Sequence, residues 1–327
     1  MTVLITGAGM IGRLTAARLR ARGENVLLAD IAPGPAAQAD GLEVVSCDVT
    51  DLTRLDQLVA DHGVVSIVHT AALLSTAIRR DPLAGIRVNT MGTANVLEIA
   101  RRRKLARVVI ASSTTVTYSA FASLPATPIP EDFPYRIVSE RPASIYAATK
   151  IAGEHLALAY ASLYDLDVVV LRYAAVLGAG PEAATSVPGK LLGCLLRAGQ
   201  SGIAARLDDP VLTWNGREEF VDARDCAAAN VAALHAPAPA QRVYHIATGR
   251  WFSLDEFIDV VRERYPSLDI AELKLPAGGF AAFPHVRPAP SDAGAAQREL
   301  GFTTRYSLAD TVAHFAESLQ TASRQSA

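Results

Sequence analysis

The stretch Thr6-Gly7-Ala8-Gly9-Met10-Ile11-Gly12 decides the fold of this chain of 327 residues. It ends a short β-branched run, Thr2 to Thr6, that is typical of a buried parallel strand. It also opens a helical segment that ends near Gly23. Glycines at this spacing give a tight turn and let the backbone approach a pyrophosphate, while the N-terminus of the helix faces the anion. The motif therefore predicts a dinucleotide-binding βαβ unit.

The next strand ends at an acidic residue that bears on the choice of cofactor. The run Asn25 to Ala29 delivers Asp30 eighteen residues after Gly12. A carboxylate at this point accepts hydrogen bonds from both ribose hydroxyls and repels a 2′-phosphate. We therefore expect NAD rather than NADP as the cofactor.

Strands and helices alternate over the first half of the chain. Further strands are expected at 43–46, 64–68, 107–111 and 167–171, with helices at 52–60 and 82–104. This order predicts an α/β fold with a doubly wound parallel Rossmann sheet, whose ligands bind at the carboxyl ends of the strands. The later elements are shorter and richer in glycine and proline. We thus expect an NAD-binding domain over 1–174, rejoined by parts of 217–250, and a smaller C-terminal α/β substrate-binding region over 175–327.

A tyrosine and a lysine stand four residues apart in Ser144-Ile145-Tyr146-Ala147-Ala148-Thr149-Lys150. On a helix this spacing places both side chains on one face. Lowering a tyrosine pKa of about 10 by about three units takes roughly 4 kcal/mol, which a fixed positive charge can provide. Tyr146 is therefore predicted to be a general acid/base whose pKa Lys150 lowers. The alternative is a helix that contains this common pattern by chance.

Composition excludes several functions. The formal charge of −2, from 31 basic and 33 acidic residues spread along the chain, argues against nucleic acid as a partner. The widely separated Cys47, Cys194 and Cys226 support neither disulfides nor a metal site. His69 has no second ligand at metal spacing and is expected to pack at a strand end. With no long uncharged apolar run and no leader pattern, we expect a cytoplasmic protein without a membrane partner.

Taken together, these motifs resemble those of the extended short-chain dehydrogenases/reductases, in the NAD-dependent epimerase/dehydratase family. The resemblance covers nearly the whole chain. It rests on the glycine-rich turn, Asp30, Asp48-Val49, Ala71-Ala72, Asn89, Ser112-Ser113, Tyr146 with Lys150, Leu171-Arg172-Tyr173, the segment Arg217 to Asp225, and Arg287-Pro288 before Leu300-Gly301-Phe302.

The resemblance implies roles for individual residues. It implies Ser113, Tyr146 and Lys150 as the catalytic set, with Ser113 bound to the reacting oxygen and Lys150 also holding the nicotinamide ribose. Asp48 and Val49 would flank the adenine, and Tyr173 would lie near the nicotinamide. The implied cofactor-binding residues are Gly7, Gly9, Met10, Ile11, Gly12, Asp30, Ile31, Asp48, Val49, Thr70, Ala71, Ala72, Asn89, Tyr146, Lys150 and Tyr173. The implied substrate-binding residues are Ser113, Thr114, Arg217 and Arg287, where the two arginines match positions that hold a substrate diphosphate.

Several residues depart from the family pattern. The glycine turn is one residue shorter than the usual TGxxGxxG. Ala175 and Leu177 stand where nucleotide-sugar enzymes often have asparagine and tyrosine. Thr114-Thr115 replaces the Asp-Glu pair of the dehydratases, which argues against dehydration.

Three functions therefore remain open. The first, which we favour, is an NAD-dependent epimerase of a secondary alcohol in a sugar-type substrate, namely a nucleotide-sugar epimerase. The second is a net dehydrogenase of a sugar acid, polyol or hydroxy amino acid, since Ala71-Ala72-Leu73-Leu74-Ser75 is similar to a segment of short-chain-type threonine dehydrogenases. The third is a non-catalytic NAD-binding redox sensor or scaffold. By resemblance we also expect a homodimer, formed partly by Ile151, His155, Leu158, Ala159 and Ser162.

Overall fold

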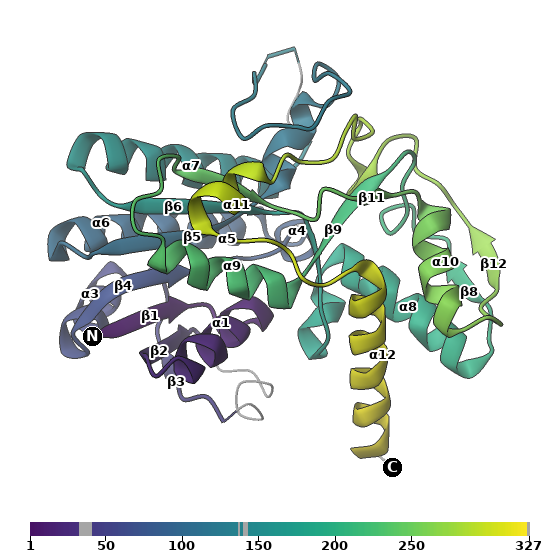
Figure 1. The fold of residues 1–327 in the computed structure, drawn as a ribbon, viewed down its shortest axis with the longest axis horizontal. Helices are drawn as coiled ribbons and strands as arrows, with labels where there is room; N and C mark the ends of the chain where they lie inside the picture. The colour runs from purple at the N-terminus through teal and green to yellow at the C-terminus, as the bar shows by residue number, and fades with distance from the viewer. Residues whose placement is uncertain (33–40, 137, 140–142, 326–327) are drawn as a thin grey trace.

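A seven-stranded parallel sheet forms the larger part of the molecule, drawn on the left of Figure 1. The structure, a computed structural model, describes residues 1–32, 41–136, 138–139 and 143–325. In spatial order the strands are β10 (Val243–Ile246), β6 (Val168–Tyr173), β5 (Arg107–Ser113), β4 (Val64–His69), β1 (Thr2–Thr6), β2 (Asn25–Asp30) and β3 (Val44–Ser46). All neighbouring pairs are parallel. The predicted doubly wound sheet is confirmed.

Alternate side chains of the strands enter two separate apolar layers, as the pleat requires. Ile5 packs in the layer that includes Leu19 and Ala229, whereas Leu4 packs in the layer that includes Leu55. Helices cover both faces: α1 (Met10–Ala21), α9 (Ala223–His235) and α11 (Gly294–Leu300) on one, and α3 (Leu52–Asp61), α6 (Thr93–Arg103) and α7 (Ile145–Tyr164) on the other. The carboxyl edge of the sheet is thus left for the site.

The expected long helix over 82–104 contains a wider turn. It consists of α5 (Pro82–Ile86), a π-helical turn η1 (Arg87–Gly92) and α6, and it follows the short α4 (Ser75–Ile78). A π-helical turn accommodates one additional residue and is frequent at functional sites. In this chain it contains the buried Asn89.

The remaining elements form a smaller body, on the right of Figure 1. Its strands make two small sheets, β11 (Trp251–Phe252), β9 (Glu218–Asp222) and β7 (Ala175–Leu177) in one, and β12 (Ile270–Leu273) with β8 (Ala205–Leu207) in the other. Its helices are η2 (Thr114–Ala120), η3 (Pro181–Thr185), α8 (Val187–Ser201), α10 (Leu254–Arg264), η4 (Phe280–Ala282) and α12 (Leu308–Gln325). A core built on Trp214, Phe220 and Phe257 holds them together. None of the described helices is long and apolar enough to cross a membrane.

Residues beyond 174 return to the large sheet. Strand β10 extends it beside β6, and helix α9 packs on α1. The buried Arg107 at the start of β5 stabilises this return, since its guanidinium donates to the carbonyls of Ala233, Leu234 and Ala236 at the end of α9. It also pairs with Asp167 at 2.7 Å. A cation on the last carbonyls of a helix satisfies acceptors that have no partner within the helix.

We expect Arg107→Ala to lower the free energy of unfolding by about 3 kcal/mol, because it removes several charged hydrogen bonds at once and leaves buried carbonyls unpaired. Urea unfolding followed by circular dichroism would measure this. The matched control is Arg242→Ala, since Arg242 binds the same Asp167 but is 38% exposed; it should cost less than about 1 kcal/mol. Equal losses in the two variants would contradict the role of Arg107 at the end of α9.

Candidate active site

The glycine-rich turn brings β1, β4 and α1 into close backbone contact. Gly7 has φ +94°, and a Cβ there would lie 2.6 Å from the backbone nitrogen of Ala71. A Cβ on Gly12 would lie 1.9 Å from the carbonyl oxygen of Gly7. Only glycine fits these two positions. The shorter spacing of the motif is therefore compatible with the close helix–strand contact that the sequence predicts.

The middle glycine of the motif, Gly9, faces open space. A Cβ on Gly9 would meet no atom within 4 Å, and α1 begins directly after it, at Met10. The first turn of α1 has neither a side-chain cap nor an acidic residue. The first N–H groups of a helix have no partner within the helix, and here they lie beside the open space at Gly9. Such an arrangement suits a pyrophosphate.

Asp30 lies beside this turn, as the sequence predicts. Its Oδ2 accepts from the backbone nitrogen of Ala8 at 2.6 Å, and Oδ1 accepts from that of Ala32 at 3.3 Å. The donor set and the free space therefore fit a dinucleotide with its phosphates at Gly9 and a ribose at Asp30. When bound, NAD takes up the hydride that leaves a substrate carbon.

The three predicted catalytic residues lie at the carboxyl ends of β5 and the start of α7. Ser113 ends β5 and hydrogen-bonds Tyr146, which lies in the first turn of α7. The Nζ of Lys150 is 5.8 Å from the centroid of the Tyr146 ring and donates to the carbonyl of Ala111 at 2.8 Å. A phenol, a hydroxyl and an amine that converge on one point can hold a substrate hydroxyl and move its proton.

Burial has the largest effect on the pKa of Tyr146, and a lowering of that pKa by Lys150 stays a prediction. Burial raises the pKa of Tyr146 to about 12, and the hydrogen bond with Ser113 opposes that rise. Burial also lowers the pKa of Lys150 to about 8, and the nearby Glu154 opposes that fall. Tyr146 is therefore protonated at neutral pH and is set to donate a proton. To accept one, it needs more positive charge at the site.

Asn89 joins the loop after β4 to the catalytic helix α7 by hydrogen bonds. Its Oδ1 accepts from the nitrogen of Leu73 at 2.7 Å, and its Nδ2 donates to the carbonyl of Leu73 and to Oγ1 of Thr149. These bonds occupy the side-chain amide that the sequence assigned to the cofactor. Asn89 thus positions Thr149, the residue before Lys150.

A buried ion pair that the sequence analysis missed lies one turn beyond Lys150. Glu154 pairs with Arg172 of β6 at 2.7 Å and accepts from Oγ of Ser112 at 2.5 Å. Both charged side chains are at least 90% buried. The sequence contains a signal for this pair. Glu154 follows Lys150 by four residues, so on a helix it lies on the same face as Tyr146 and Lys150.

The other predicted cofactor residues lie around the carboxyl edge of the sheet, and they differ in their contacts and exposure. Oγ1 of Thr70 donates to the carbonyls of Thr6 and Gly7, so it stabilises the turn. The hydroxyl of Tyr173 donates to Asn230 of α9 at 2.7 Å, in the core between the sheet and α9. Ile31 is exposed, Asp48 is partly exposed, and Val49 is buried against Gly92. Cofactor contacts at these positions stay predictions.

The two arginines assigned to the substrate already have partners. Arg217 forms an ion pair with Glu256 and lies 5.9 Å from the Trp251 ring. Arg287 is buried and pairs with Glu218 at 2.8 Å and with Glu219 at 3.5 Å. The third assigned residue, Thr114, is 1% exposed. Substrate binding by these residues stays a prediction.

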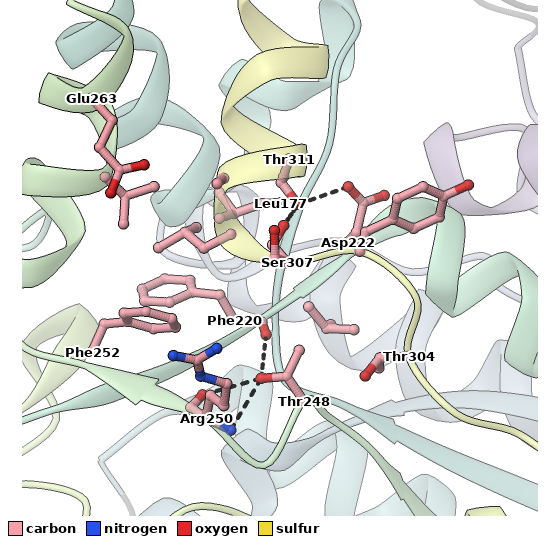
Figure 2. A pocket seen from close by; sticks show the side chains of 15 residues that line it. Leu177, Phe220, Asp222, Thr248, Arg250, Phe252, Glu263, Thr304, Ser307 and Thr311 are labelled. Atoms are coloured by element: carbon pink, nitrogen blue, oxygen red, sulfur yellow. Dashed lines mark hydrogen bonds between the residues drawn. The ribbon is translucent and has the colours of Figure 1, made fainter.

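A separate pocket of about 410 Å³ lies where β9, α10 and the start of α12 meet (Figure 2). Thr311 donates to Asp222 there, and Thr248 donates to the carbonyl of Phe220. None of Ser113, Tyr146 and Lys150 lines it. Among the described residues, no group of three or more histidine, cysteine or acidic side chains is placed to hold a metal ion.

The model of the NAD dependent epimerase/dehydratase family matches residues 3–247. The chain belongs to this family. It is accordingly an NAD-dependent enzyme, as the sequence predicts. UDP-glucose 4-epimerase of Mycolicibacterium smegmatis is 33% identical over 236 residues, which cover 69% of this chain and 67% of the relative.

Two solved structures are similar to this chain over almost its full length. MoeE5, in complex with UDP-glucose and NAD, is 27% identical with a TM-score of 0.78, and the match covers 98% of this chain and 99% of MoeE5. L-threonine dehydrogenase from Phytophthora infestans is 25% identical with a TM-score of 0.77, over 98% of this chain and 100% of that one. One of these similar structures thus contains UDP-glucose and NAD, and the other is a threonine dehydrogenase.

His69 at the end of β4 makes the stability of this family member depend on pH. Its ring nitrogens contact Oγ1 of Thr6 at 2.7 Å and Oγ1 of Thr93 at 3.0 Å, which confirms a packed strand-end residue. Burial, with a smaller contribution from Lys150, lowers its pKa from 6.5 to about 3. The unfolded chain therefore takes up a proton below about pH 6.5 that the folded chain takes up only near pH 3.

We expect the folded chain to lose about 1.4 kcal/mol of stability per pH unit at this residue as the pH falls from about 6 to 4. His69→Gln should remove that contribution and give a shallower pH dependence in urea unfolding. The control His62→Gln, at an exposed position, should follow the unsubstituted chain. Identical slopes for His69→Gln and the unsubstituted chain would contradict a neutral His69 in the fold.

Proposed function

We propose that the chain is an NAD-dependent epimerase that inverts a secondary alcohol of a sugar-type substrate. The observation that supports this most directly is the convergence of Ser113, Tyr146 and Lys150 at the edge where the glycine turn and Asp30 would hold NAD. The relatives named UDP-glucose 4-epimerase and UDP-arabinose 4-epimerase favour epimerisation. The carboxylate of Asp30 favours NAD over NADP.

Ser113, Tyr146 and Lys150 have different roles in this reaction. Ser113 and Tyr146 hold the substrate hydroxyl, and Tyr146 exchanges its proton. Lys150 supplies positive charge beside the phenol, most fully below its pKa of about 8. Positive charge from Lys150 and from a bound nicotinamide ring would let the phenol give up its resting proton and accept that of the substrate hydroxyl. Tyr146 would then return this same proton to the carbonyl oxygen when the carbon is reduced on its other face.

A net dehydrogenase is the second candidate. The specific observation in its favour is that Arg217 and Arg287 are both paired with glutamates, which leaves little positive charge for a nucleotide. A solved L-threonine dehydrogenase of the same fold supports it as well. In that case NADH leaves after each turnover. The same residues would serve, since one fold hosts both outcomes.

NADH fluorescence would separate the two candidates. The purified chain receives NAD or NADP and, in turn, nucleotide sugars, free sugars, sugar acids, polyols and hydroxy amino acids. We expect a flat trace and an inverted sugar in the product with NAD. Tyr146→Phe should lose about 10²-fold or more of the rate, because it lacks the proton-transfer group.

Continuous accumulation of NADH that Tyr146→Phe abolishes would establish the dehydrogenase instead. If no member of the panel were inverted or oxidised, while the chain bound NAD normally, a non-catalytic NAD-binding role would replace both candidates.

We also propose that the enzyme works as a homodimer through α5, η1 and α7. Large apolar side chains are exposed on these neighbouring elements, among them Leu83 at 67%, Met91 at 53% and Leu158 at 39%. Apolar area of this kind on adjacent helices favours a self-complementary contact.

Leu158→Glu should convert a dimer to a monomer in analytical ultracentrifugation, because it places a charge in the apolar contact. Leu273→Glu is the matched control, since Leu273 is 44% exposed but lies on β12, away from these helices. A dimer that tolerates Leu158→Glu would contradict this interface.

A further inference from the structure

A buried cluster of one cation and two carboxylates lies in the smaller body. We call it the Arg287 cluster; it consists of Tyr118, Glu218, Glu219, Arg287 and Ser291. The side chains of Arg287 and Glu219 are 0% exposed, and that of Glu218 is 2% exposed. With both carboxylates ionised, the formal charge of the cluster is −1. A buried group of this kind is expected to be fully hydrogen-bonded.

The carboxylate oxygens of the cluster are indeed all occupied. Glu218 accepts from the hydroxyl of Tyr118 at 2.8 Å, from Nε of Arg287 at 2.8 Å and from the nitrogen of Glu219 at 2.7 Å. Glu219 accepts from the nitrogen of Gly249 at 2.9 Å and from that of Ser291 at 3.0 Å. These oxygens therefore have little capacity left for a ligand.

Groups of the chain enclose the guanidinium of Arg287. Its Nε binds Glu218, and its Nη1 lies within hydrogen-bond distance of Glu219, Ser291 and the carbonyl of Ala289. Its Nη2 is buried, and the guanidinium lies over the rings of Tyr118 and Phe121. Arg287 therefore has no exposed donor to offer a phosphate group.

The cluster adjoins the catalytic residues. Tyr118 lies in η2, the turn that follows Ser113 directly. The guanidinium carbon of Arg287 is 5.4 Å from the centroid of the Tyr118 ring and 5.2 Å from that of Phe121. Tyr118 also shares a core with Ala147, the residue after Tyr146. The Arg287 cluster is thus joined through η2 to the strand end that carries Ser113.

We propose that the Arg287 cluster selects a substrate without phosphate groups, namely an uncharged, hydroxyl-rich molecule of the free sugar or polyol class. This inference rests on the proposed function, because it names the substrate of that same site. A diphosphate needs several donors and a net positive environment. The cluster has a charge of −1, and two like charges repel strongly where water is excluded.

Protonation does not reverse this conclusion. Burial raises the pKa of Glu219, against the opposing effect of Arg287. A protonated Glu219 would make the cluster neutral, which lessens the repulsion of a diphosphate but supplies no positive charge to attract one. Arg217 lies in a partly exposed pair with Glu256, so its charge is partly offset as well.

Isothermal titration of the NAD-loaded enzyme with UDP tests the proposal without requiring turnover. We expect no saturable binding of UDP up to about 1 mM, a concentration that corresponds to about 4 kcal/mol of binding free energy. Glu219→Gln removes one negative charge and should strengthen UDP binding by about tenfold or more. The control Glu272→Gln, in a surface pair with Arg206 near the same body, should leave UDP binding unchanged.

Binding of UDP by the unsubstituted enzyme at micromolar concentration, or its turnover of a nucleotide sugar, would overturn the proposal. This outcome is distinct from a failure of the proposed function. An enzyme that inverts no sugar but also binds no UDP, while Glu219→Gln binds it, would disprove the epimerase and support the charge selection. The measurement on the unsubstituted enzyme decides the matter if Glu219→Gln does not fold.

Discussion

The ion pair between Glu154 and Arg172 fixes the geometry on which the catalytic set depends. Glu154 lies one turn after Lys150 on α7, Arg172 belongs to β6, and Ser112 precedes Ser113 on β5. Removing two charges from water costs several kcal/mol each, so the pair is a weak source of stability. It instead specifies one arrangement, because any shift of α7 along the sheet would leave a charge buried without its partner. The Ser113 and Tyr146 hydroxyls meet because of this constraint.

Asn89 applies a second constraint from the other side of α7. Its amide joins the loop after β4 to Thr149, and the π-helical turn presents it to both. The catalytic helix is thus held at two points, on the strand ends and on the loop that borders the glycine turn. Short hydrogen bonds to buried groups of this kind keep reacting atoms within the small tolerance that proton transfer requires.

Local spacing explains why much of this could be predicted from the sequence. The glycine turn, Asp30 and the Tyr146–Lys150 pair each depend on residues that are close in the chain or on the regular order of strands. The pairing of Arg287 with Glu218 and Glu219 spans about 70 residues, and that of Arg172 with Glu154 depends on the register of α7 against β6. No local pattern specifies such contacts. The raised pKa of Tyr146 likewise follows from burial, which the spacing of two side chains does not reveal.

The place of β10 has a consequence for how the chain is made. Strand β6 ends at Tyr173, but its outer neighbour begins only at Val243. At a synthesis rate of about 5–20 residues per second, β6 waits roughly 4–14 s with its outer backbone groups unpaired. Such an edge is a template for pairing with another chain. During this period the nascent protein can associate wrongly with other chains. The period ends when β10, the last strand of the sheet, leaves the ribosome.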